Sequence, residues 1–145
     1  MGRIRMRRIE SASGKNLLSF IEDNIDTGSL VHTDGWRGYS GVKKKGYHHE
    51  VSILKESGPE ALPRVHLVAS LLKRWMLGTH QGAISIAHME HYLDEFVFRF
   101  NRRTSKSRGK LFLRLIEQAV QTPPVPFSNI TKHSRQYKPT KKSAR

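Results

Sequence analysis

The stretch LVHTDGWRGY, residues 30–39, predicts a short apolar strand that ends on an acidic residue. Gly35 follows Asp34 directly and interrupts the strand pattern. An acidic side chain at the carboxyl end of a strand is a common site location in α/β folds, and its carboxylate is a suitable ligand for Mg²⁺. The alternative is that Asp34 only stabilises the turn.

Outward from this stretch, alternating apolar residues predict further strands over residues 3–9 and 47–54. Ser11 or Ser13 is the expected cap of the first helix, and Gly78 is expected to stop the third. The predicted helices cover residues 14–25, 36–45, 65–77, 85–103 and 110–121. Strands come first and helices dominate the second half, so the pattern indicates an α/β or α+β fold.

Composition narrows the class of protein. The chain has 145 residues, enough for one domain, and a formal net charge of +14. Because it has no cysteine, a disulfide scaffold, a thiol nucleophile and a thiolate zinc site are excluded. No apolar run approaches the roughly 18 residues of a membrane span, and the start lacks a signal peptide, so a cytoplasmic protein is expected. The excess of 26 Lys and Arg over 12 Asp and Glu favours nucleic acid as the partner over an acidic membrane surface.

The predicted helix over residues 65–77 brings three polar side chains to one face. At about 100° per residue, His66, Ser70 and Lys73 fall together, and the apolar positions fall opposite. Polar side chains gathered on one helix face in this way are candidates for a functional site. The alternative is an ordinary solvated helix face.

Basic residues gather at the end of the helix predicted over 85–103. Six lie within twelve residues: Arg99, Arg102, Arg103, Lys106, Arg108 and Lys110. Cations stabilise a helix C-terminus, which is the structural explanation, but six exceed that need and favour contact with phosphates. Residues 122–145 are rich in proline and basic residues, so we expect a flexible tail that either touches nucleic acid non-specifically or is inert.

Three segments resemble a known family. TDGWRGY (33–39), HLVASLLKRWMLGTHQG (66–82) and YLDEFVFRFNRR (92–103) are similar, in this order, to the catalytic core of ISXO-type insertion-sequence transposases, bacterial enzymes with an RNase H-like fold. GRIRMRRI (2–9) and LFLRLIEQAV (111–120) also fit. The resemblance covers about residues 1–121, which it implies are part of an α/β, RNase H-like domain.

The resemblance implies DDE-type chemistry, in which two divalent ions, Mg²⁺ or Mn²⁺, promote in-line attack on a DNA phosphodiester. Asp34 matches the second catalytic aspartate of the family. His66 occupies the position of the third ligand, seven residues before Lys73, and Lys73 matches a basic residue that contacts DNA near the reacting end. Asp34, His66 and Lys73 are therefore the expected catalytic residues, with Asp34 and His66 as metal ligands.

The match lacks two features of the family. The first catalytic aspartate precedes the segment that matches GRIRMRRI, and the zinc-ribbon DNA-binding region is not matched, so the sequence resembles the C-terminal part of a catalytic domain. The expected metal site is therefore incomplete, and imidazole suits Mn²⁺ better than Mg²⁺. We expect a truncated transposase with little activity alone; the alternative is a non-catalytic basic DNA-binding module or regulator of transposition.

The partners expected from this resemblance are transposon-end DNA and either another copy of the chain or a complementary N-terminal transposase chain. An incomplete sheet exposes an edge that invites such pairing. The cytoplasmic nucleoid is the expected location. The residues expected to contact DNA are Lys73, Arg74, Arg99, Arg102, Arg103, Lys106 and Arg108.

Overall fold

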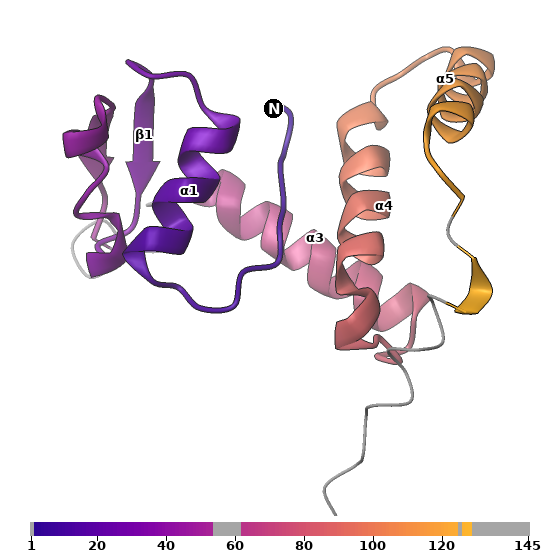
Figure 1. The fold of residues 1–145 in the computed structure, drawn as a ribbon, viewed down its shortest axis with the longest axis horizontal. Helices are drawn as coiled ribbons and strands as arrows, with labels where there is room; N and C mark the ends of the chain where they lie inside the picture. Colours follow the sequence, from indigo (N-terminus) through magenta and orange to yellow (C-terminus); the bar gives the residue numbers. More distant parts are fainter. Residues whose placement is uncertain (1, 54–61, 125, 129–145) are drawn as a thin grey trace, which may run out of the picture. The chain divides into compact units, whose positions relative to one another are not determined.

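The computed structural model describes residues 2–53, 62–124 and 126–128. They form two compact units (Figure 1): residues 5–82 make up the first, and residues 2–4 together with those from 83 onward make up the second. A mixture of helices with a small parallel sheet agrees with the predicted α/β class. Of the basic tail predicted over residues 122–145, the part from residue 129 onward lies outside the described residues.

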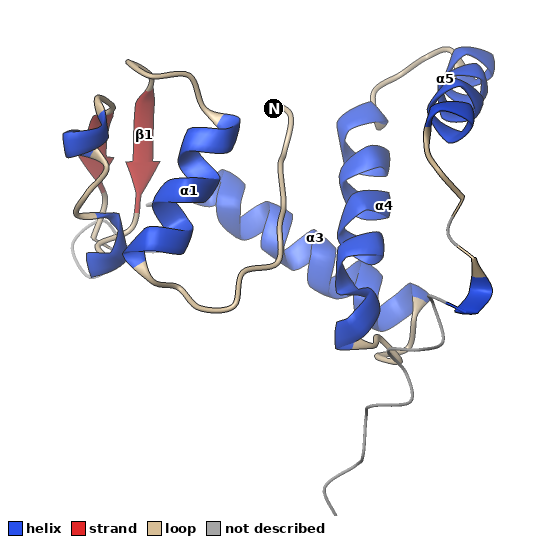
Figure 2. Ribbon diagram, viewed as in Figure 1, coloured by secondary structure: helices blue, strands red, loops and turns tan. Residues whose placement is uncertain are grey.

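In its described residues, the first unit combines two α-helices with two parallel strands (Figure 2). Helix α1 spans Gly14–Asn24, and its N-cap is Ser13, whose hydroxyl accepts a hydrogen bond from the Asn16 amide. Strands β1 (Leu30–Thr33) and β2 (His48–Val51) pair in parallel, with Val31 opposite His49. Parallel strands need a crossover connection, which here consists of two short 3₁₀ helices, η1 (Arg37–Tyr39) and η2 (Lys43–Lys45).

The core of this unit lies between α1, β1 and the crossover. Ile21, Val31, Val42 and Tyr47 are buried, and Val42 is completely so. The Tyr47 hydroxyl donates to the Ile25 carbonyl at 3.1 Å, which satisfies the polar tip of a buried ring. Of the apolar stripe expected along α1, only Ile21 is buried, and the other members are half-buried: Leu17, Leu18, Phe20 and Ile25.

Glycines permit the close approach of α1 and η1. A Cβ atom on Gly38 would lie 2.7 Å from a methyl of Leu17 and 2.8 Å from the Trp36 indole. A Cβ atom on Gly41 would lie 2.7 Å from a methyl of Leu18. Gly38 and Gly41 therefore serve packing. Residues 36–45 form two 3₁₀ turns in place of the predicted helix, and glycine is a poor helix former at these positions.

Helix α3 (Pro63–Thr79) begins with proline in its first turn and runs past Gly78, contrary to the prediction that Gly78 stops it. Its end is set by Gln81 and Gly82, whose φ angles of 49° and 74° are left-handed and incompatible with a continuing helix. None of its residues is buried. Leu54, the last residue of the strand predicted over 47–54, lies outside the described residues, and β2 ends at Val51.

The second unit contains α4 (Met89–Arg102) and α5 (Arg108–Gln121). The predicted helix over 85–103 is in fact a 3₁₀ turn, η4 (Ile86–His88), followed by α4, because the Ser85 hydroxyl caps the turn by accepting from the Ala87 amide. Leu93, Phe96 and Phe100 are buried at the predicted helical spacing. The Phe96 and Phe100 rings pack with centroids 6.0 Å apart.

Residues 3–9 form no strand, contrary to the prediction. The Ile4 amide donates to Oδ1 of Asn101 at 2.7 Å, and Nδ2 of Asn101 donates to the Ile4 carbonyl at 3.0 Å. The Asn101 side chain thus satisfies both backbone groups that a strand partner would use. Among the described helices, none is long and apolar enough to cross a bilayer.

Candidate functional site

Asp34 lies directly after β1 and is held at two points. Its carboxylate oxygen Oδ1 accepts a hydrogen bond from the Trp36 amide at 3.1 Å, and its carbonyl accepts one from the Thr33 hydroxyl at 2.8 Å. The second carboxylate oxygen accepts no hydrogen bond from any residue that the structure describes. Asp34 is half-buried, so this oxygen is oriented by the loop and still available to a ligand.

The loop after Asp34 is anchored by Trp36. The indole Nε1 of Trp36 donates to the Ala12 carbonyl at 3.1 Å, and the ring lies against Gly38. These contacts connect the loop to the residues that precede α1. The Trp36 amide that holds the Asp34 carboxylate is therefore itself fixed in position.

The pKa of Tyr39 depends on its burial and on the charge of Asp34. Burial raises the pKa of the Tyr39 phenol above its ordinary value of 10.0, and the negative charge of Asp34 raises it further. Both effects disfavour the charged phenolate beside Asp34. Tyr39 is not among the site residues predicted from the sequence.

His49 is a second residue that the sequence analysis missed. Its Nε2 atom lies 2.8 Å from the Thr33 hydroxyl, which also contacts the Asp34 carbonyl. The alternation along β2 places His49 on the same face as Val51, and pairing with β1 brings that face next to Thr33. The alternation is visible in the sequence, but the register that creates the contact is not.

His66 and Lys73 lie exposed on one face of α3, as the helical spacing predicts. The opposite face carries half-buried apolar residues: Val68, Leu71, Leu72 and Trp75. Asp34 and His66 belong to the same unit, but no hydrogen bond joins these two described side chains. His66 and Lys73 thus share one exposed face of α3, and Asp34 and His66 are not joined by a hydrogen bond in the described part of the chain.

The described residues do not complete a metal site. No group of three or more His, Asp or Glu side chains among them could hold a metal ion. Asp34 fits as one ligand, because one carboxylate oxygen is oriented and the other is open. A complete site would need ligands in addition to those that residues 2–53, 62–124 and 126–128 bring together.

At the end of α4, two arginines stabilise the helix itself. The guanidinium of Arg102 lies 3.9 Å from the Phe98 ring centroid, and that of Arg103 lies 4.0 Å from the Phe100 centroid. Arg103 also donates to the Phe100 carbonyl at 2.7 Å. These contacts are the structural role that cations have at a helix C-terminus.

The other members of the basic cluster differ in their pairing. Arg99 forms an exposed ion pair with Glu95, with nitrogen and oxygen 2.8 Å apart. Lys106 and Arg108 are exposed and have no ion-pair partner in the described part of the chain. Lys73 and Arg74 on α3 are likewise exposed and unpaired within the described ranges.

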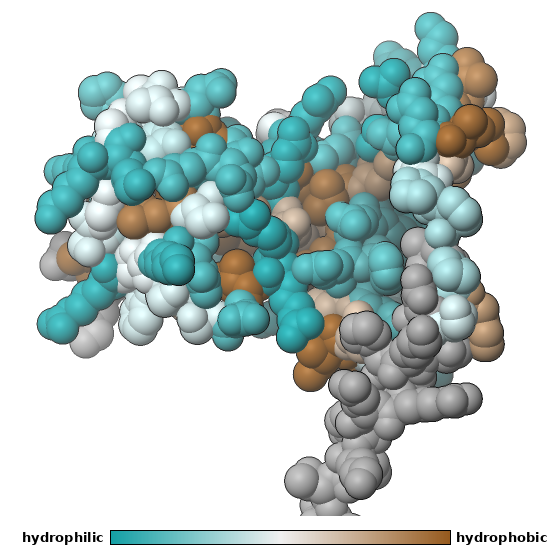
Figure 3. Space-filling view, viewed as in Figure 1, coloured by the Kyte–Doolittle hydropathy of each residue, from teal (hydrophilic) through white to brown (hydrophobic). Residues whose placement is uncertain are grey.

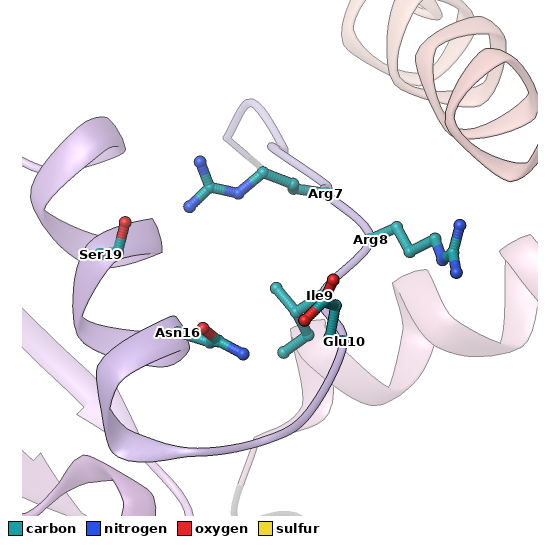
Figure 4. Close-up of a pocket in the computed structure, with 6 residues that line it drawn as sticks. All are labelled: Arg7, Arg8, Ile9, Glu10, Asn16 and Ser19. Carbon is teal, nitrogen blue, oxygen red and sulfur yellow. The ribbon is translucent and has the colours of Figure 1, made fainter.

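Two pockets lie away from Asp34. The first, of about 220 Å³, lies between residues 7–10 and α1 (Figure 4), where Arg7 forms an ion pair with Asp23 at 2.7 Å. The second, of about 430 Å³, lies between Arg102 and one face of α5. Figure 3 shows hydrophobic atoms over α5, whose exposed apolar residues include Phe112, Leu113, Leu115, Ile116 and Val120.

The first pocket contains no predicted site residue, and the second contains Arg102 and Lys110 of the basic cluster.

Comparison with known proteins identifies the family. A family model described as the ISXO2-like transposase domain matches residues 1–101, which include Asp34, His66 and Lys73. No curated protein and no solved structure matches the chain. Because the matched residues make up more than half of the 145-residue chain, the protein belongs to the family of ISXO2-like transposase domains.

Proposed function

We propose that this chain takes part in DNA transposition by metal-dependent phosphodiester hydrolysis and strand transfer, with Asp34 as a catalytic metal ligand. The observation that carries the proposal is the state of Asp34 within the family-matched residues: one carboxylate oxygen is held by the Trp36 amide and the other is open. The proposal includes an RNase H-like fold, of which β1 and β2 would be part. DDE transposases generally use divalent metal ions.

In this proposal, His66 is a second ligand and Lys73 contacts a phosphate near the reacting DNA end. Bound metal ions would supply activation of water or a 3′-hydroxyl and stabilisation of the leaving oxygen. Because the described residues do not bring a full ligand set together, we propose that the chain alone has little activity. The missing ligands would come from a complementary transposase chain or another copy.

Iron-directed cleavage of the polypeptide tests Asp34 as a ligand. Fe²⁺ bound in place of Mg²⁺ generates hydroxyl radicals with ascorbate and peroxide, and these radicals cut the backbone near the metal. We expect cuts close to residue 34 and close to residue 66, read by mass spectrometry, and we expect excess Mg²⁺ to suppress them. We expect the cut near residue 34 because Asp34 has a carboxylate oxygen that is open to a metal ion.

The matched control is Asp26→Asn, which removes an exposed carboxylate from the turn after α1. It should leave the cleavage pattern intact, whereas Asp34→Asn should abolish the cut near residue 34. Absence of a Mg²⁺-sensitive cut there in the unaltered chain would contradict the proposal that Asp34 binds metal.

A non-catalytic DNA-binding module or regulator of transposition is the second candidate function. The observation in its favour is that four of the seven predicted DNA-contacting cations are exposed and have no ion-pair partner among the described residues, while these residues do not complete a metal site. These cations are Lys73, Arg74, Lys106 and Arg108. Under this function, DNA binding would depend on the cations and would be indifferent to Asp34.

Both functions require that unpaired cations contact DNA phosphates, which salt dependence measures. Replacing both Lys106 and Arg108 with glutamine should make the negative slope of log K for DNA binding against log salt shallower by about two. Each phosphate contact contributes about −0.9 to this slope. The measurement is fluorescence anisotropy with a labelled duplex at several salt concentrations. The charge-matched control replaces Lys43 and Lys44 on η2, which are also exposed. Equal slopes for the two double variants would exclude a specific role of Lys106 and Arg108.

A further inference from the structure

We infer that His49 is a positioning residue for Asp34 and acts through the hydroxyl of Thr33. The inference rests on the proposed function of Asp34. Nε2 of His49 lies 2.8 Å from Oγ1 of Thr33, and Oγ1 lies 2.8 Å from the Asp34 carbonyl oxygen. The three residues thus form a continuous chain of hydrogen bonds from β2 to the end of β1.

Counting hydrogens gives the direction of each bond. A hydroxyl has one hydrogen, and a backbone carbonyl can only accept. Thr33 therefore donates its hydrogen to the Asp34 carbonyl and accepts a hydrogen bond from His49. It follows that Nε2 of His49 carries a hydrogen, and that removing the imidazole leaves a buried hydroxyl oxygen without its donor.

Burial makes the arrangement hard for water to replace. Thr33 is only 7% exposed, and its neighbour on the same face of β1, Val31, is also 7% exposed. A hydrogen bond in such surroundings is stronger than in water, and an unmade one is more costly. The Thr33 hydroxyl is therefore dependent on His49 for its orientation.

The consequence for Asp34 is that its main chain and its side chain are held from two sides. Thr33 fixes the carbonyl, and the Trp36 amide fixes Oδ1 of the carboxylate at 3.1 Å. Loss of the first contact frees the peptide after Asp34, and with it the Trp36 amide. Outer partners that orient metal-binding side chains commonly affect metal affinity in this way.

Hydrogen exchange of the Trp36 amide tests this inference without metal. Thr33→Val keeps the shape and removes the hydroxyl, and His49→Leu removes the imidazole donor. In both variants we expect the amide of Trp36, followed by NMR, to exchange about tenfold faster, which corresponds to the loss of one hydrogen bond. Thr33→Ser and His49→Gln retain the required hydroxyl and donor, so they should restore slow exchange.

The Ile25 amide, which donates to the Ile21 carbonyl at 2.9 Å, reports the stability of α1 in the same spectra. Unchanged Trp36 exchange in Thr33→Val and His49→Leu would overturn the inference. Equal acceleration at Trp36 and Ile25 would also overturn it, because the residues would then only stabilise the fold. Failure of Thr33→Ser and His49→Gln to restore slow exchange of the Trp36 amide would overturn it as well.

Mn²⁺ affinity, measured by electron paramagnetic resonance, separates this inference from the proposed function. We expect Thr33→Val and His49→Leu to weaken Mn²⁺ binding about tenfold, as is typical for partners that orient a ligand. If the unaltered chain binds Mn²⁺ no better than Asp34→Asn, the proposed role of Asp34 fails. The exchange of the Trp36 amide still decides whether His49 positions Asp34.

Discussion

Replacing Asp34 with asparagine is expected to reduce strand transfer by about 10²–10³-fold, the usual cost of removing one charge-stabilising group from a reacting centre. Asparagine has the same shape, and its oxygen can still accept the Trp36 amide hydrogen bond seen at Oδ1. It lacks the negative charge that makes a carboxylate a stronger ligand than a neutral amide for a divalent cation. The loss would therefore be electrostatic, with the loop structure intact.

The reaction is measured on transposon-end DNA with Mg²⁺ or Mn²⁺, in the presence of a complementary transposase chain. Asp26→Asn is the control, since it makes the same chemical change at an exposed turn. Activity of Asp34→Asn within about threefold of the unaltered chain, less than the cost of a lost charge contact, would favour the non-catalytic function. Should the unaltered mixture be inactive, the comparison of Mn²⁺ affinities decides the role of Asp34.

Replacing Gly38 with alanine is expected to destabilise the protein by about 2–4 kcal/mol, the sum of an overpacking cost and one lost hydrogen bond. The new Cβ would lie 2.8 Å from the Trp36 indole and 2.7 Å from a Leu17 methyl. The Leu17 methyl is at the end of a flexible side chain, but the indole is rigid and is tied to the Ala12 carbonyl at 3.1 Å. The indole must move, and this hydrogen bond is lost.

Urea unfolding followed by Trp fluorescence measures the change in the free energy of unfolding. Gly35→Ala is the matched control in the same segment, because its Cβ would meet Ile53 at an ordinary contact distance of 3.5 Å. We expect this control to change stability by less than about 1 kcal/mol. Equal stability of the two variants would show that the Trp36 ring does not require glycine at position 38.

Several elements could be predicted because their signals are local. Ser13 followed by the apolar spacing of α1 predicted a helix within one residue of the observed Gly14–Asn24. The spacing of Leu93, Phe96 and Phe100 predicted the buried face of α4. Such signals arise within one or two turns of the chain, where backbone geometry alone relates the residues.

Other predictions were wrong because distant contacts override local preference. Residues 3–9 alternate like a strand, but the Ile4 backbone is satisfied by the Asn101 side chain, 97 residues away in the sequence. The Asn101 contact is not visible in a short window of sequence. Gly78 is a different case, because a local feature ends α3: the helix continues to Thr79, and the left-handed backbone that follows it begins at Gln81.

The sequence by itself determined the family, the strand that ends just before Asp34 and the shared face of His66 and Lys73 on α3, because each depends on residue types at short, regular spacing. Only the tertiary structure decided that His49 contacts Thr33 and that the Trp36 ring lies against Gly38. The physical reason is that strand register and side-chain packing arise between segments brought together by folding. The carboxylate of Asp34 can therefore be recognised from the sequence, whereas the contacts that orient it are decided only by the tertiary structure.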